Sequence, residues 1–561
     1  MGTNFYGQLT KALVIFIGTL VIIPIIFGFI GFFLPSFGYF PILGKSEFNL
    51  NYFHLSFNIA GISKSIILSL FTGLVSTLLA LFFSQVILLY LFKTRAYNYI
   101  KIIISPLIAL PHITMAIGLI FLFSPSGLFF RLISPWLTGF DRPPNIFIMP
   151  DEYGLFLILG LILKEIPFFI LVSLSALQEF SAKKIFDLGK SLQNSNFSSW
   201  CILIFPLIYK KIRFVIFIVI AFTASVVDMS LILAPSTPST LAIRILQTYQ
   251  SSDADSLFIA SNLALIQLFI IIILLLFWMV LEKIVSYKLS FIFFMKILSF
   301  KTFFIKKIVV LTSVILFFLS ILGIISSLIW GFSANWYFPN FFPKSLTLDV
   351  FTNFYNENKS IIFISIFISF IVSLISSLLT IIWVELIEIL KIKKIYLEWI
   401  IFIPLFIPQI SFLIGLQSFI IIFDFDSYLL PLIIIQLFYV IPYSFIILAP
   451  SLREIKKEII IVATSLGKNR LQRLLSIKIP IVMSSLLTSF AIGMLVSFSL
   501  YTPVYFFGGG RITTLTVEAL NLALSGSRQD LGVATFFQII IPILILITVA
   551  YLSKKICKWR F

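Results

Sequence analysis

The chain has 561 residues, of which 60% are hydrophobic and 11% are charged, and its mean hydropathy is +1.13. Soluble domains are about 45–50% apolar and about 25% charged, so this composition excludes a soluble globular protein. The net charge is +18, with 40 Lys and Arg against 22 Asp and Glu. Nucleic-acid binding and membrane topology can both produce such an excess, and the placement of the basic residues decides between them.

About twelve segments are long and apolar enough to cross a membrane as helices. Each has roughly 20 or more mostly apolar residues, which a helix needs to cross a ~30 Å hydrocarbon core. They lie near residues 11–34, 65–92, 102–124, 154–178, 212–235, 256–281, 307–332, 360–390, 398–423, 428–450, 480–507 and 531–553. We therefore expect an all-α polytopic membrane protein.

The basic residues gather on one side of these spans. Most of the 40 Lys and Arg precede the first span, lie in the loops after the even-numbered spans, or follow the last span. Because basic loops stay on the cytoplasmic side, both termini are expected in the cytoplasm, in a multi-pass protein of the cell inner membrane. The charge is then a signal of topology among membrane lipids, and we expect no nucleic-acid partner.

The two halves of the chain resemble each other. The matched positions are KSII at 64–67 and 359–362, Pro111 and Gly118 with Pro408 and Gly415, Pro206 with Pro480, and Thr240-Leu241 with Thr514-Leu515. Each half has six spans, an even number, so the two copies run in the same direction through the membrane. This predicts two parallel six-helix repeats related by an axis along the membrane normal.

Residues that carry enzyme chemistry are scarce and scattered. Cys201, Cys557, His54 and His112 are isolated, and the chain has no HExxH, CxxC or Walker A sequence. We therefore expect no enzyme activity, no catalytic residue, no cofactor, no metal site and no ATPase within this chain.

The loop after the tenth span carries an unusual helical pattern. Residues 454–466 favour a helix, Gly467 suits the left-handed residue that ends one, and Asn469 can cap a second helix. An apolar stripe with a basic end then follows at helical spacing, comprising Leu471, Leu474, Leu475 and Lys478. Pro480 marks the return to the membrane. The loop is predicted to be a rigid helix–turn–helix that projects into the cytoplasm.

This loop resembles the EAA loop of ABC importer permeases, whose pattern is roughly E-A-A-x-x-L-G followed by thirteen residues and a Pro. The second half matches it at Val462-Ala463, Leu466, Gly467 and Pro480, and the first half at Asp187-Leu188-Gly189, Leu192 and Pro206. Two departures stand out, because Gln193 replaces the turn glycine in the first half and Ile461 replaces the acid in the second. The alternative is an ordinary amphipathic surface loop that occurs twice.

The resemblance implies a type I ABC importer permease in which both transmembrane domains are fused in one chain. Residues 225–246 and 508–532 are similar to the YnjC-like group of such permeases. The implied partners are two copies of a cytosolic ATP-binding subunit and a periplasmic or surface solute-binding protein. The implied cargo is a small solute such as thiamine, ferric iron or a related compound. The implied ATPase-coupling residues are Asp187, Gly189, Leu192, Pro206, Ala463, Leu466, Gly467, Arg470 and Pro480.

The resemblance also implies the domain organisation. A first helix and periplasmic loop (1–59) precede the first type I transmembrane domain (60–281). A basic cytoplasmic linker (282–306) leads to the seventh helix and its periplasmic loop (307–356). The second type I transmembrane domain covers 357–556.

Two polar features interrupt the apolar spans. Asp228 lies about 21 Å past the inner boundary of the fifth span at 1.5 Å per residue, beyond the membrane midplane, and its counterpart in the second half is Thr502. It either lines the translocation pathway with Thr502, or is buried between the halves and hydrogen-bonded to Thr223, Ser225 or Ser230. Lys164 and Glu165 favour a local ion pair over a proton relay.

Two rival functions have to be weighed. A secondary transporter with twelve helices would share the repeat, but it would more often carry charged residues in several spans and would not need the duplicated loop. A polytopic membrane enzyme would need His, Asp or Arg clustered at one interface, and the sequence shows no such cluster.

Overall fold

The computed structural model describes residues 22–146, 148–191, 196–253, 255–295, 303–390, 394–423 and 428–558. Over these residues the chain is almost entirely helical, and its strands form one short hairpin, β1 (Ser333–Asn335) with β2 (Ser345–Leu346). The expected all-α polytopic architecture is confirmed.

Nine helices in the described residues are long and apolar enough to cross a membrane, or ten if a bent pair counts as one span. The first expected span begins outside the described residues, and its described part is the shorter apolar helix Ile22–Ser36. The fifth expected span is broken. The number twelve therefore stays a prediction, although the remaining ten expected spans each coincide with one of these helices or with the bent pair.

The first half combines long helices with short segments, and we call its long helix Ile62–Leu91 the scaffold helix of this half. Its elements are α2 (Asn51–Phe57), α3 (Ile62–Leu91), α4 (Ile100–Ala109), α5 (His112–Phe123), α6 (Leu128–Ile133), α7 (Leu155–Gln178), α8 (Ala182–Ser191), α9 (Asn196–Ser199), the π-helical turn η3 (Trp200–Ile204), α10 (Phe205–Ser225), α11 (Asp228–Leu233), α12 (Leu241–Tyr249) and α13 (Ser256–Met295). Short 3₁₀ turns occupy Pro41–Leu43 and Arg95–Asn98.

The second half repeats this order. Its elements are α14 (Phe303–Phe332), α15 (Asp349–Leu390), α16 (Lys394–Phe406), α17 (Gln409–Phe423), α18 (Leu429–Arg453), α19 (Lys457–Ser465), α20 (Arg470–Arg473), the π-helical turn η4 (Leu474–Lys478), α21 (Ile479–Ser499), α22 (Thr502–Phe507), α23 (Leu515–Ser525) and α24 (Arg528–Lys558). From η3 to the start of α12, each element has a counterpart that begins 274 residues later.

Individual hydrogen bonds are duplicated as well. The backbone N–H of Leu241 donates to Ser69 Oγ at 2.9 Å, and that of Leu515 donates to Ser365 Oγ at 2.8 Å. In both halves a serine of the long scaffold helix thus satisfies the otherwise unpaired first turn of a short helix. The internal repeat predicted from the sequence is a repeat of structure.

The first helix of each half packs against a helix of the other half. A Cβ on Gly31, in the first helix of the chain, would lie 2.1 Å from the carbonyl oxygen of Gly415 in α17. A Cβ on Gly323 in α14 would lie 3.1 Å from the carbonyl carbon of Gly118 in α5. The opening helix of each half therefore packs backbone to backbone on the other half, an approach that only small residues permit.

Several expected spans are interrupted. The α10–α11 segment breaks at Val226 and Val227, and the α21–α22 segment breaks at the matching Leu500 and Tyr501. The α16–α17 pair bends by 101° next to Pro408, where proline disfavours a continuous helix. The continuous spans expected at 212–235, 398–423 and 480–507 are therefore corrected to broken helices.

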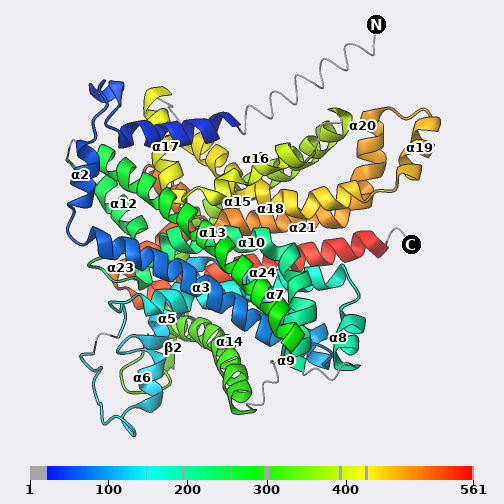
Figure 1. Cartoon of the computed structure of the whole chain (residues 1–561). Coiled ribbons are helices and arrows are strands. Elements are labelled where there is room, and N and C mark those ends of the chain that lie inside the picture. The colour runs from blue at the N-terminus through cyan, green and yellow to red at the C-terminus, as the bar shows by residue number, and fades with distance from the viewer. Residues whose placement is uncertain are drawn as a thin grey trace.

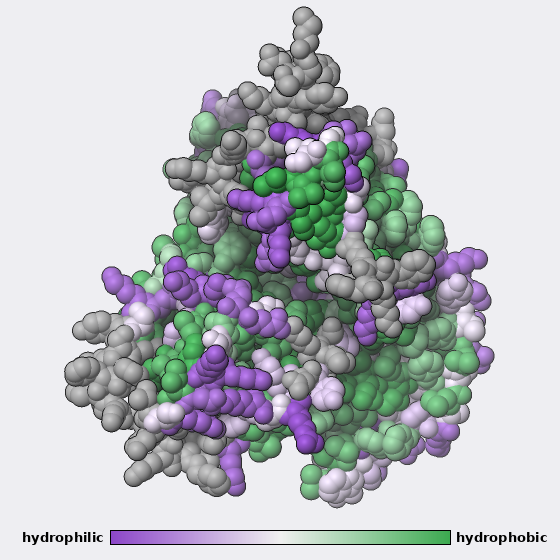
Figure 2. Space-filling view, turned by 90° about the vertical axis from the view of Figure 1, so that its right-hand side faces the viewer, coloured by the Kyte–Doolittle hydropathy of each residue, from purple (hydrophilic) through white to green (hydrophobic). Residues whose placement is uncertain are grey.

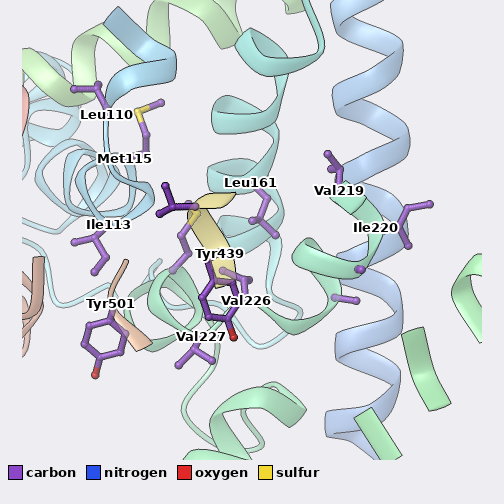
Figure 3. Packing of buried hydrophobic residues seen from close by; sticks show 14 of the residues in the cluster. Leu110, Ile113, Met115, Leu161, Val219, Ile220, Val226, Val227, Tyr439 and Tyr501 are labelled. Carbon is purple, nitrogen blue, oxygen red and sulfur yellow. The ribbon is translucent and has the colours of Figure 1, made fainter. Parts of the chain in front are cut away.

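One hydrophobic core joins the halves. Tyr439 and Tyr501 from the second half belong to the same buried cluster as Leu161, Val226 and Val227 of the first (Figure 3). The bundle carries α8 and α19 at its right-hand end, and α2, α12 and α23 at the opposite end (Figure 1). Both loops that the sequence singled out therefore lie at one end of the bundle.

Candidate coupling loops and translocation pathway

The loop of the second half is a well-capped helix–turn–helix. α19 ends where Gly467 adopts φ +77°, and the N–H of Lys468 donates to the carbonyl oxygen of Ala463 at 3.1 Å. This left-handed glycine satisfies the last carbonyls of the helix. Asn469 Oδ1 then accepts from the N–H of Gln472 at 2.8 Å, and Gln472 Oε1 accepts from the N–H of Asn469 at 3.0 Å. The predicted turn and cap are both present, with the partner Gln472 completing a capping box.

This loop presents an apolar surface with a basic border. Leu466, Leu471 and Leu475 are 73%, 64% and 57% exposed. Arg470 follows the cap at the start of α20, with Arg473 at its end. Figure 2 looks onto the end of the bundle that carries α8 and α19, where apolar surface is flanked by strongly hydrophilic side chains. Exposed leucines on a well-capped projection are typical of a protein-binding surface.

The base of the same loop is fixed by a buried cation. Lys478, the last residue of η4, is 8% exposed, and its Nζ lies 2.5 Å from Glu385 Oε1 and 2.9 Å from Glu388 Oε2. Both carboxylates belong to α15, the scaffold helix of the second half. Pro480 stands in the first turn of α21, where its missing N–H costs nothing.

The loop of the first half is built on the same plan with different contacts. Asp187 in α8 forms an ion pair with Lys93, which follows α3. A Cβ on Gly189 would lie 2.7 Å from Ser199 Oγ, so α8 lies directly against the segment that leads into α10. The matching Ala463 is the buried residue of α19. Pro206 stands in the first turn of α10, while Leu192 and Gln193 lie outside the described residues.

Asp228 lies at the break between α10 and α11. Its Oδ1 accepts from the N–H of Met229 at 2.9 Å, which places the carboxylate at the favourable, N-terminal end of α11. The expected hydroxyl partners donate elsewhere, because Thr223, Ser225 and Ser230 bond to the carbonyls of Val219, Ala221 and Val226. Thr502 occupies the matching position at the start of α22 and is buried.

Three further ionisable groups lie in the region of Asp228. His112 and Lys164 are its electrostatic neighbours, and His112 Nε2 lies 3.8 Å from Glu165 Oε1. Lys164 Nζ donates to the carbonyls of Leu107, Ile108 and Leu110 at the end of α4, at 3.4, 2.9 and 2.5 Å. Lys164 therefore caps a helix, and Glu165 lies beside His112, so the local ion pair expected between these two neighbours in sequence is replaced by separate contacts. We call His112, Lys164, Glu165 and Asp228 the polar cluster.

Comparison with known proteins agrees with this architecture. Residues 389–560 match the family described as binding-protein-dependent transport system inner membrane component. The chain is also similar to the inner membrane ABC transporter permease protein YnjC of Escherichia coli (strain K12), with 23% identity over 453 residues that cover 80% of each chain. These two matches support a type I ABC transporter permease. The family match falls in the second half, and the duplicated elements extend the same architecture to the first.

The chain contains candidate functional residues that the sequence alone does not reveal. Helical spacing places Lys478 on a surface stripe, although it is buried against two glutamates. His112 looks isolated, because Glu165 is 53 residues away in sequence and only the helix packing brings the two together. Within the residues that the structure describes, no group of three His, Cys, Asp or Glu side chains could hold a metal ion.

Proposed function

We propose that this permease forms the solute pathway of a binding-protein-dependent importer and is driven by two cytosolic ATPase subunits. The observation that carries the proposal is the pair of structured loops, α8–α9 and α19–α20, at one end of the bundle. A connection between helices needs no caps, no buried ion pair and no exposed leucines. A surface that transmits force needs rigidity and a firm anchor.

Each loop is anchored in its own half. Lys478 ties the second loop to α15, and Asp187 ties the first to the residue after α3. Movement of a docked ATPase subunit would therefore shift the whole half rather than bend a loop. Rocking of two parallel repeats about a central site is an established mode of alternating access.

The coupling roles are proposed for Asp187, Gly189, Leu192, Pro206, Ala463, Leu466, Gly467, Arg470 and Pro480. The basic residues of the second loop orient it on an acidic ATPase surface, and the leucines supply contact area. The proposed domain limits are 1–59, 60–281, 282–306, 307–356 and 357–556. In this arrangement both termini are cytoplasmic, and a solute-binding protein delivers a small solute at the other end.

Asp228 and Thr502 are proposed to line the pathway. Both begin a short helix immediately after a break, one in each half. Broken helices at the interface of two repeats are where transporters of several folds bind their cargo. A carboxylate on one side and a hydroxyl on the other favour a cationic or hydroxyl-rich solute.

The test is reconstitution of the full chain with its ATPase subunit and binding protein in proteoliposomes. Uptake of the solute that copurifies with the binding protein should require ATP on the side of the membrane that carries the ATPase subunit. It should stop when the ATPase carries a substitution that blocks hydrolysis. Uptake that continues with the inactive ATPase and follows an ion gradient would instead establish a secondary transporter.

A further inference from the structure

The polar cluster belongs to one half only. At the matching positions of the second half, His112 is replaced by Gln409, Lys164 by Tyr439, Glu165 by Val440 and Asp228 by Thr502. A purely architectural role in the repeat would favour similar groups on both sides. The ionisable groups therefore mark a chemical difference between two halves that are otherwise built alike.

The cluster contains more acidic than ammonium side chains. Glu165 and Asp228 are two carboxyl groups, and Lys164 is the one ammonium, which also donates to three carbonyl oxygens of α4. Ionisable groups inside a membrane protein are costly and usually have a functional partner. His112 and Asp228 retain partial exposure, with the side chain of His112 24% exposed, whereas Glu165 is 6% exposed.

Aromatic groups from both halves lie near these ionisable groups. The ring of Phe222 lies 4.7 Å from that of His112. From the second half, Tyr443 is an electrostatic neighbour of Glu165, and Tyr501 is one of Asp228. The faces of such rings attract organic cations.

A further buried polar atom of this region is the hydroxyl of Tyr439. Tyr439 is 6% exposed, and its hydroxyl has no hydrogen-bond partner among the residues that the structure describes. Figure 3 shows its ring extending toward the segment that holds Val226 and Val227, the break immediately before Asp228. A buried hydroxyl without a partner costs free energy unless another state of the protein, or a ligand, satisfies it.

We propose that His112, Glu165 and Asp228, faced by Tyr439, Tyr443 and Tyr501, form a binding site for an organic monocation inside the transport pathway. The site rests on the proposed function, because a solute reaches it only when the halves move. Two carboxyl groups beside one ammonium favour a ligand that brings a positive charge. The ammonium of Lys164 disfavours a multivalent metal ion, and the tyrosine hydroxyls suit a ligand with hydrogen-bonding groups.

The site can be tested on the purified full chain without knowledge of the natural cargo. The probes are choline and benzyltrimethylammonium, with 3,3-dimethylbutan-1-ol and neopentylbenzene as neutral analogues of the same shape. The cations should raise the melting temperature in a saturable way, and the neutral analogues should not. Asp228→Asn and Glu165→Gln should each raise the half-saturating concentration about tenfold, whereas Asp228→Glu should stay close to the unmodified chain.

Glu518→Gln is the matched control, because Glu518 lies in α23, outside the cluster. Stabilisation by neither cation, or equal stabilisation by the neutral analogues, would overturn the site. Preferential stabilisation by a divalent metal ion would also overturn it. The ATPase rate of the reconstituted complex distinguishes failure of the cation site from failure of the proposed importer function. If the chain stimulates the ATPase but binds no cation, only the cation site is contradicted and the importer function is retained. If the chain never stimulates the ATPase, the proposed function itself is contradicted.

Discussion

The Nζ atom of Lys478 lies 2.5 Å from Oε1 of Glu385, across the base of the second candidate coupling loop. This pair joins the end of η4 to the scaffold helix α15 and brings in Glu388 as a second acceptor. The first half has an ion pair at its corresponding loop with the charges exchanged, because there the cation Lys93 follows the scaffold helix and the anion Asp187 is on the loop. The two halves thus reach the same anchoring by different residues.

Replacing Lys478 by Met should weaken this anchor. The change leaves Glu385, whose side chain is 20% exposed, without its cation, and we expect a loss of about 1–3 kcal/mol of stability at the loop. Cargo-stimulated ATP hydrolysis in the reconstituted complex should fall severalfold. Lys468→Met is the control, because Lys468 is partly exposed and its Nζ donates to the hydroxyl of Ser476 at 3.1 Å, with no carboxylate partner among the described residues. Equal rates for the two variants would contradict the anchoring role.

Replacing Gly467 by Val should impair coupling through the backbone alone. Gly467 has φ +77°, and a Cβ added there would meet no atom of the described residues within 4 Å. The cost of about 1–2 kcal/mol therefore comes from the left-handed conformation and not from a clash. Gly467→Asn should be better tolerated, because Asn adopts this conformation more readily. Gly510→Val provides the matched control at φ +70° in equally open space on the other side of the bundle. ATP-driven uptake should fall only with Gly467→Val.

The two loops should differ in their tolerance of a single methyl group. Gly189→Ala places a Cβ 2.7 Å from Ser199 Oγ and 2.8 Å from Leu203 Cδ1, an overpacking that costs about 1–3 kcal/mol. Ala463→Gly, at the matching position, removes a buried methyl group and costs about 1 kcal/mol. Thermal unfolding of the purified chain should show the larger loss for Gly189→Ala. A larger stability loss for Ala463→Gly than for Gly189→Ala would contradict the close packing of α8 against Ser199.

The exposed leucines of the second loop should matter for binding and not for folding. Leu471→Ser and Leu475→Ser remove apolar surface that is 64% and 57% exposed in the isolated chain. Together they should weaken affinity for the ATPase subunit at least about tenfold, if each contributes about 1 kcal/mol at the interface. The melting temperature of the chain alone should be unchanged. Normal affinity would show that the ATPase contacts another surface.

The sequence predicts the local features of the loops accurately. Gly467 and Asn469 have strong conformational preferences of their own, so the turn and cap follow from neighbouring residues. The duplication is also visible, because prolines and glycines recur at constant spacing. The helix predicted at 454–466 begins three residues later, at Lys457, since a break separates it from α18.

Contacts between helices that are far apart in the sequence cannot be predicted from local residue preferences. The backbone contact of Gly31 with Gly415 depends on how the first helix packs against the other half, and hydropathy carries no signal of that packing. The break before Asp228 escapes prediction for a related reason. Val226 and Val227 fit an apolar helix as well as an extended turn, and only the packing of α11 against α5, α7 and α23 selects the turn.

The central claim is that both loops dock on ATPase subunits. Chemical crosslinking from single cysteines in the loops tests it most directly. A chain with Cys201→Ser and Cys557→Ser receives one new cysteine, by Leu188→Cys in the first loop or Leu471→Cys in the second, at sites that are 63% and 64% exposed. Leu524→Cys, also 63% exposed but on the other side of the bundle, is the control. We predict that a short thiol-to-amine crosslinker joins both loop cysteines, but not the control, to the ATPase subunit in the assembled complex. Crosslinking at neither loop, or at one loop only, would contradict coupling through the pair.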